Sequence, residues 1–201
     1  MHAGRTSTKP RPVRGFVVSA LAFGVFKWTV YALLALNVAL YGLHGTLNEQ
    51  LDTAAWVVLL LLFEWETGAW RMSSLQRRAA HAVRAAAALA IAWACIGYAR
   101  EREWLDFANA ATWVAVVVAL ELEVRVPPAR RRFHRARRAL TVGLYVALAS
   151  FLVAWLLLGL AEGGAAAWLD AWDAALWLLA FAVIELNVFG WARAVGSSTR
   201  A

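Results

Sequence analysis

The sequence predicts an all-α polytopic membrane protein with six transmembrane helices, arranged as three parallel two-helix (hairpin) repeats with pseudo-threefold symmetry. Three observations lead to this fold class: 62% of the residues are hydrophobic, long apolar runs alternate with short polar segments, and one motif recurs three times. A soluble domain of 201 residues would carry more charge and fewer long apolar runs. We therefore expect a single membrane domain over residues 1–201.

Six apolar segments are expected to cross the bilayer. Several are shorter than the roughly 20 residues that a helix needs to cross the hydrocarbon core, so their ends must reach into polar flanks or the bilayer must thin. The apolar run Phe16–Phe26 before the first span is either an interfacial helix or an extension of that span. The six spans are roughly Trp28–Leu43, Thr53–Trp70, Ala85–Tyr98, Phe107–Val124, Leu140–Leu160 and Ala174–Trp191.

The recurring motif is an acid or amide, three residues, a tryptophan, seven residues and a glutamate. The second copy follows the first by 57 residues, and the third follows by 64, a difference that we assign to the Gly- and Ala-rich loop Ala161–Asp170. Each repeat holds two spans, so the copies enter the membrane in the same orientation. The repeats cover about residues 26–70, 83–125 and 138–191, between an N-terminal segment (1–25) and a polar tail (192–201). The copies are Asp52, Trp56, Glu64; Asn109, Trp113, Glu121; and Asp173, Trp177, Glu185.

The basic residues predict the orientation. Eighteen of the twenty Lys and Arg residues lie before the first, third and fifth spans or in the tail, and only Arg100 and Arg102 lie on the opposite side. The positive-inside rule then places both termini in the cytoplasm, with the chain integral to a cytoplasmic (inner) membrane. A basic cluster precedes the fifth span and is expected to bind anionic lipid headgroups rather than nucleic acid. The cluster consists of Arg130, Arg131, Arg132, Arg135, Arg137 and Arg138.

The first two positions of the motif have ordinary structural interpretations. Tryptophans near the outer surface of a membrane protein commonly form an interfacial belt, and we expect Trp56, Trp113 and Trp177 to do so. The acid or amide four residues earlier is expected to begin each helix as an N-cap or a first-turn acid.

The glutamates are the functional candidates. Glu64 lies twelve residues after Asp52, or about 18 Å along a helix, which places it in the cytoplasmic half of the bilayer. An ionisable group at that depth is expensive to keep and marks a candidate site. A second polar residue follows each glutamate by two positions and points about 200° away on the helix. These secondary residues are Glu66, Glu123 and Asn187.

Three interpretations of Glu64, Glu121 and Glu185 remain open from the sequence. They pair with basic counter-charges that begin the preceding helices, for which Lys27, Arg84 and Arg138 are the candidates. They line an ion or proton path around a threefold axis, where close carboxylates favour a shared proton or a bound cation. Or they anchor a cofactor or lipid headgroup.

The function that the sequence favours is a channel or carrier for a small cation or proton. The alternative is a non-catalytic scaffold or accessory subunit of a larger membrane complex, with the glutamates in structural ion pairs. The sequence contains no HExxH, GxSxG, P-loop or dinucleotide-binding motif, so it gives no sign of an enzyme. Its four histidines and single cysteine have no metal-ligand spacing, and we predict no cofactor and no metal centre.

Overall fold

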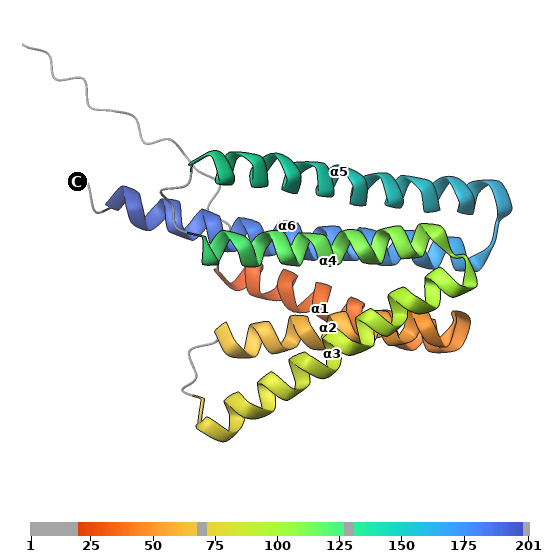
Figure 1. The fold of residues 1–201 in the computed structure, drawn as a ribbon, viewed down its shortest axis with the longest axis horizontal. Coiled ribbons are helices and arrows are strands. Elements are labelled where there is room, and N and C mark those ends of the chain that lie inside the picture. The colour runs from red at the N-terminus through yellow and green to blue at the C-terminus, as the bar shows by residue number, and fades with distance from the viewer. Residues whose placement is uncertain (1–19, 68–71, 127–130, 199–201) are drawn as a thin grey trace, which may run out of the picture.

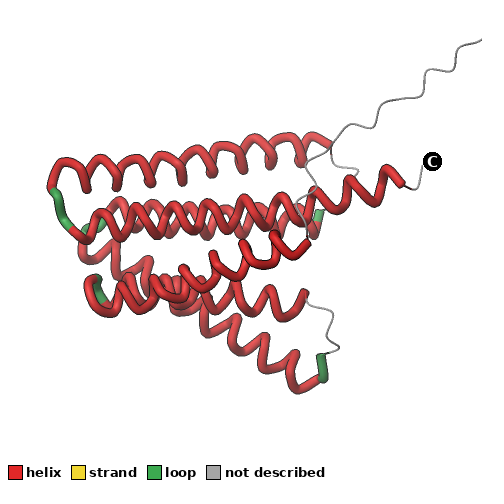
Figure 2. Tube along the Cα trace, turned by 180° about the vertical axis from the view of Figure 1, so that it is seen from behind, coloured by secondary structure: helices red, strands yellow, loops and turns green. Residues whose placement is uncertain are grey.

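The computed structural model describes residues 20–67, 72–126 and 131–198, and over that part of the chain every regular element is an α-helix (Figures 1 and 2). The helices form three antiparallel hairpins, and in each hairpin only two residues separate the helices. The helices are α1 (Ala20–His44), α2 (Leu47–Thr67), α3 (Ser74–Glu101), α4 (Trp104–Arg125), α5 (Arg131–Glu162) and α6 (Ala165–Ser198).

The six helices form a closed ring. Each helix contacts the next one along the chain, and α1 also contacts α6, so the first and third hairpins meet. The short turns within the hairpins lie at one end of the bundle (Figure 1). We call this the hairpin end. The first residues of α1, α3 and α5 and the last residues of α2, α4 and α6 lie at the opposite end (Figure 1).

The chain is a membrane-embedded helical protein. Four segments are long and apolar enough to cross a bilayer, and large apolar side chains such as Leu89 and Trp93 are 72% and 63% exposed. So much exposed apolar surface requires lipid or a partner to cover it. The four segments are Phe23–His44, Ser74–Glu101, Trp104–Leu122 and Arg132–Glu162.

The helices extend beyond the predicted spans. Helix α1 continues without a break through Lys27, so the described part of the apolar run before the first span is an extension of that span. Residues 16–19 of this run lie outside the described residues. Helix α6 continues to Ser198, so the backbone of the predicted polar tail is helical as far as that residue.

The extra seven residues of the third repeat do not form a loop. Only Gly163 and Gly164 separate α5 from α6, so the prediction of a loop over Ala161–Asp170 is wrong. Compared with the first two hairpins, α5 is four residues longer beyond Trp155 and α6 begins three residues earlier before Asp173. Each addition is about one helical turn. The side chains on the far side of each addition therefore keep the same helix face as their counterparts in the first two hairpins. Gly163 makes the turn with a φ of +65°, a conformation that glycine adopts without steric cost.

Local capping fixes where α2 begins. The hydroxyl of Thr46 accepts a hydrogen bond from the backbone N–H of Glu49 (3.2 Å), while the Glu49 carboxylate accepts one from the backbone N–H of Thr46 (2.5 Å). This reciprocal pair is a capping box, which satisfies backbone donors at the helix start. The capping box also holds the Glu49 side chain at the hairpin end of the bundle, where it faces the site described next.

Candidate functional site

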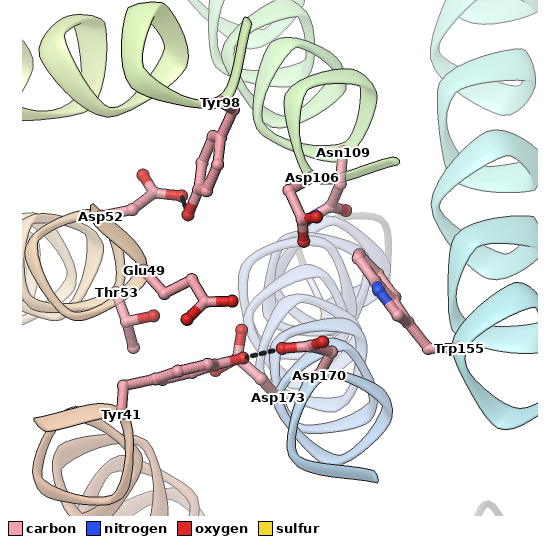
Figure 3. A pocket seen from close by; sticks show the side chains of 10 residues that line it. All are labelled: Tyr41, Glu49, Asp52, Thr53, Tyr98, Asp106, Asn109, Trp155, Asp170 and Asp173. Atoms are coloured by element: carbon pink, nitrogen blue, oxygen red, sulfur yellow. Dashed lines mark hydrogen bonds between the residues drawn. The ribbon is translucent and has the colours of Figure 1, made fainter. Parts of the chain in front are cut away.

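A polar pocket of about 30 Å³ lies inside the ring of helices near the hairpin end. Every helix contributes at least one residue to its lining, and no Lys, Arg or His is among the described residues that line it (Figure 3). The volume is enough for one or two water-sized species. The lining consists of Tyr41, Glu49, Asp52, Thr53, Tyr98, Asp106, Asn109, Trp155, Asp170 and Asp173.

Three carboxylates from three different helices meet at this pocket. Glu49 on α2, Asp106 on α4 and Asp170 on α6 each have an oxygen within 4.8 Å of the others. Figure 3 shows their carboxylates pointing toward a common centre. We call these three residues the outer acidic triad. At an effective dielectric constant of 20, two unit charges at this separation repel by about 3 kcal/mol. A proton or a bound cation would relieve that repulsion.

A second layer of polar residues lies one helical turn further along the same helices. It consists of Asp52, Asn109 and Asp173, the first residues of the recurring motif, and all three line the pocket. The prediction that they begin their helices is wrong, because α2, α4 and α6 start five or more residues earlier. Their side chains therefore face the interior of the ring instead of capping a helix.

The outer acidic triad is not among the site residues that the sequence predicts, although the signal is present. Glu49, Asp106 and Asp170 each lie three residues before the motif's acid or amide, so they recur at the same intervals of 57 and 64 residues. Residues three apart share a helix face. Extending the motif by one turn toward the N-terminus would have identified all three.

The odd-numbered helices contribute one aromatic residue each. Tyr41, Tyr98 and Trp155 lie at successive intervals of 57 residues, and all line the pocket. The Tyr41 hydroxyl donates to Asp170 (2.9 Å), and the Tyr98 hydroxyl donates to Asp52 (3.4 Å). Each phenol therefore connects its helix to an acid from another hairpin.

Hydrogen-bond acceptors outnumber donors in and around the pocket. Asn37, which is fully buried on α1, donates from Nδ2 to Asp173 (2.7 Å), but its own Oδ1 has no hydrogen-bond partner. The buried Oδ1 of Asp52 also lacks a partner. Buried polar atoms are rarely left unpaired, because an unmade hydrogen bond costs about 1–3 kcal/mol. The Asp52 oxygen is therefore an acceptor to which a proton, a cation or water can bind.

The connection between α3 and α4, Arg102 and Glu103, places a further carboxylate at this end of the bundle. Burial raises the pKa of Glu103, and the neighbouring charges of Glu101 and Glu49 raise it further. An opposite charge would act in the other direction. The electrostatic environment at the hairpin end therefore favours the binding of positive charge.

The three tryptophans of the motif lie one helical turn further from the hairpin end than the second polar layer, and they pack against one another. Their ring centroids are separated by 6.5 Å (Trp56–Trp113), 6.4 Å (Trp56–Trp177) and 6.2 Å (Trp113–Trp177). Separations of this size are typical of favourable aromatic pairs. The prediction of an outward-facing interfacial belt is therefore wrong. The tryptophans instead fill the centre of the helix ring, and we call them the tryptophan triad.

The glutamate of the first repeat does not lie in a shared cavity. Glu64 forms an ion pair with Lys27 on α1, the counter-charge that its sequence position predicts, and accepts a hydrogen bond from the Tyr31 hydroxyl (3.4 Å). Glu66, two residues on, forms an ion pair with Arg84 on α3. The two carboxylates thus face different neighbouring helices, as their angular separation on α2 requires.

The other predicted site residues are spread over the end opposite the pocket. Glu121 pairs with Arg125 one turn away on its own helix, with 2.7 Å between Nε and Oε1, and not with Arg84. The side chains of Glu121 and Arg125 are both more than half exposed. The side chains of Glu123, Glu185 and Asn187 lie outside the described part of the structure, and Arg138 is exposed in the first turns of α5.

Comparison of the chain with protein-family models, with curated proteins and with solved structures finds no match.

Proposed function

We propose that the protein binds a small cation or a proton in the acidic pocket and translocates it across the membrane as a channel or carrier. The observation that carries the proposal is the meeting of Glu49, Asp106 and Asp170, three carboxylates from three helices, within 4.8 Å. The unpartnered buried oxygen of Asp52 on the same pocket is independent support for a bound positive species. Ion pathways in membranes are commonly marked by such acids facing the bundle interior.

The chemistry of the pocket favours a proton or a hard cation. All of its charged groups are carboxylates, and the other oxygens come from an amide and from hydroxyl groups. Calcium and magnesium prefer oxygen ligands, whereas zinc is bound mainly by sulfur and nitrogen. The described lining contains no cysteine or histidine, which argues against a soft metal.

Within this proposal all six helices cross the membrane as three equivalent hairpins. The shared spacing of the acidic layers, the tryptophan triad and the aromatic residues of the odd helices supports this arrangement. The distribution of basic residues supports a cytoplasmic location for both termini, so the pocket lies toward the opposite side of the membrane. Arg132, Arg135 and Arg138 at the start of α5 are exposed at the other end, where anionic lipid headgroups are their proposed partners.

The deep glutamates have a structural role in the proposed mechanism. Glu64 and Glu121 each have a basic partner of their own, which favours the structural interpretation of these two residues. The acidic pocket is the better candidate for the binding step, because its carboxylates have no basic residue beside them in the lining.

The direct test measures binding and flux with purified protein. Thermal unfolding in detergent is followed with Ca²⁺, Mg²⁺, Mn²⁺, Na⁺ and K⁺, since a ligand at 100 times its dissociation constant stabilises a protein by about 2.7 kcal/mol. Flux of the same ions and of protons is measured in proteoliposomes. We expect stabilisation and flux in the wild type, and the loss of both in the triple variant Glu49→Gln, Asp106→Asn, Asp170→Asn.

The matched control is the variant Glu162→Gln, which removes an exposed carboxylate from the same end of the bundle. It should behave as the wild type, because Glu162 does not line the pocket. The proposal fails if no ion stabilises or crosses the wild type, or if the triple variant retains normal flux.

A second candidate function is a scaffold or accessory subunit in a larger membrane complex. The ion pairs Lys27–Glu64 and Arg84–Glu66 favour it, because they give the intramembrane glutamates of α2 a purely structural role. This function predicts stable co-purification with other membrane proteins, and misassembly without loss of flux when the glutamates are replaced.

A further inference from the structure

The tryptophan triad follows the acidic pocket along the bundle, on the side away from the hairpin end. Each tryptophan lies four residues, about one turn, beyond a pocket acid or amide on its own helix. Trp113 is only 7% exposed and also contacts Phe181, with 5.2 Å between ring centroids. The indole rings therefore form an aromatic layer one turn further from the hairpin end than the pocket acids and amide.

A second apolar layer comes from the odd-numbered helices. Leu34, Ile91 and Leu148 lie at successive intervals of 57 residues, and all three are buried, with 0%, 5% and 2% of their surface exposed. Each belongs to a hydrophobic cluster against which one or more residues of the tryptophan triad pack. We call these three residues the aliphatic layer.

Along helix α1 only a short apolar interval separates the polar groups on the two sides of Leu34. On the pocket side of Leu34, Asn37 donates a hydrogen bond to Asp173, and on the other side the Tyr31 hydroxyl donates one to Glu64. Asn37 and Tyr31 are six residues apart, or about 9 Å along the helix. Hydrogen-bonded polar groups therefore approach from both ends, and Leu34 occupies the interval between them.

We infer that the tryptophan triad and the aliphatic layer form the barrier that closes the pocket toward the opposite side of the membrane. This inference rests on the proposed translocation function. Apolar constrictions block ions because water leaves them and a charge loses its hydration. In this arrangement the outer acidic triad lies on the hairpin-end side of the barrier, so a cation or proton would bind there from that side, and transport requires the indole rings to separate.

The test compares passive leak with pocket binding. Trp113→Ala removes the most buried ring of the triad, and Leu34→Asn places an amide between the polar groups of Asn37 and Tyr31. In proteoliposomes, we expect each variant to leak protons (entrapped pH dye) and K⁺ (diffusion potential) at least tenfold faster than the wild type. Stabilisation by the cation that binds the wild type should stay within about twofold in apparent affinity, because neither residue lines the pocket.

The matched control is Trp93→Ala, which removes an indole that is 63% exposed on the outside of the ring and should leave the leak unchanged. Circular dichroism and size-exclusion chromatography check that each variant is folded. Trp113→Phe replaces Trp113→Ala if the latter misfolds, and it should leak less than Leu34→Asn.

Different results would overturn the barrier and the proposed function. A wild type that binds and transports a cation, together with folded Trp113 and Leu34 variants that do not leak, would overturn the barrier and leave the proposed function standing. A wild type without binding or flux would overturn the proposed function itself, and the barrier with it.

Discussion

The Tyr41 hydroxyl donates a 2.9 Å hydrogen bond to Asp170, which joins the first helix of the ring to the last. Hydrogen bonds to charged groups contribute about 1.5–3 kcal/mol. We predict that Tyr41→Phe lowers the free energy of unfolding by about 2 kcal/mol, measured by denaturant unfolding in detergent. Tyr98→Phe should have a smaller effect, because its hydroxyl is 3.4 Å from Asp52.

A double-mutant cycle isolates the Tyr41–Asp170 contact from other effects of the substitutions. The variants are Tyr41→Phe, Asp170→Ala and the two combined. We expect a coupling energy of about 1 kcal/mol or more between the two positions. A coupling energy near zero would show that the hydrogen bond does not hold α1 against α6.

Repulsion within the outer acidic triad predicts that removing one charge stabilises the cation-free protein. Asp106→Asn should raise the free energy of unfolding by about 1–2 kcal/mol in chelator, because about 3 kcal/mol of repulsion per pair is partly screened. The same substitution should reduce stabilisation by added cation. Thermal unfolding with and without chelator measures both effects, and Glu162→Gln serves as the exposed control. Destabilisation of the cation-free protein would contradict the prediction.

Protons compete with metal ions for carboxylates, so acid should weaken cation binding. We predict that cation-induced stabilisation decreases as the pH is lowered from 8 to 5 and returns when the pH is restored. The measurement is a series of thermal unfolding curves at fixed cation concentration. Stabilisation that is constant over this range would be inconsistent with carboxylate ligands.

The ion pairs of the glutamates should differ in their contribution to stability. The Lys27–Glu64 side chains are 20% and 28% exposed, whereas Arg125 and Glu121 are 74% and 58% exposed. Breaking a buried pair leaves an uncompensated charge, and allowing for partial exposure we expect Glu64→Gln to cost about 2 kcal/mol. Glu121→Gln should change stability by less than about 0.5 kcal/mol. Equal effects in unfolding experiments would show that burial does not distinguish the pairs.

Close approach of α2 and α3 predicts opposite effects at two helical glycines. A Cβ at Gly97 would lie 2.5 Å from the Asn48 side chain, which donates a 3.0 Å hydrogen bond to the Ala94 carbonyl and cannot move without breaking it. Gly97→Ala should therefore cost about 1–3 kcal/mol. Gly143→Ala is the matched control: a Cβ there meets nothing within 4 Å, so the substitution should stabilise the protein by up to about 1 kcal/mol. Unfolding curves of the two variants distinguish the cases.

The helices could be predicted from the sequence because they depend on local properties. Each predicted span coincides with a helix over its described residues, since apolar runs bounded by polar residues are readable without tertiary information. Even the recurrence of Trp56 and Trp113 was visible. The face that each motif residue presents to its neighbours is not visible in the sequence. For that reason the motif predicts an interfacial belt of tryptophans and a helix start at Asp52, and neither is correct.

The candidate site was only partly predictable for the same reason. The sequence directed attention to Glu64 and Glu121, because a carboxylate within an apolar run stands out. The outer acidic triad lies beside the polar hairpin turns, where acids are ordinary, and only its spacing distinguished it. Its convergence depends on the closure of the ring between α1 and α6, a contact between segments more than a hundred residues apart.

The sequence by itself determined that this is a helical membrane protein with most of its basic residues at one end, because hydrophobicity and charge act residue by residue. The tertiary structure decided which side chains meet. Three carboxylates, three indole rings and separate partners for Glu64 and Glu66 follow from helix rotation and register, which are set by packing between helices. Packing of this kind depends on pairs of distant residues, and no local pattern specifies it.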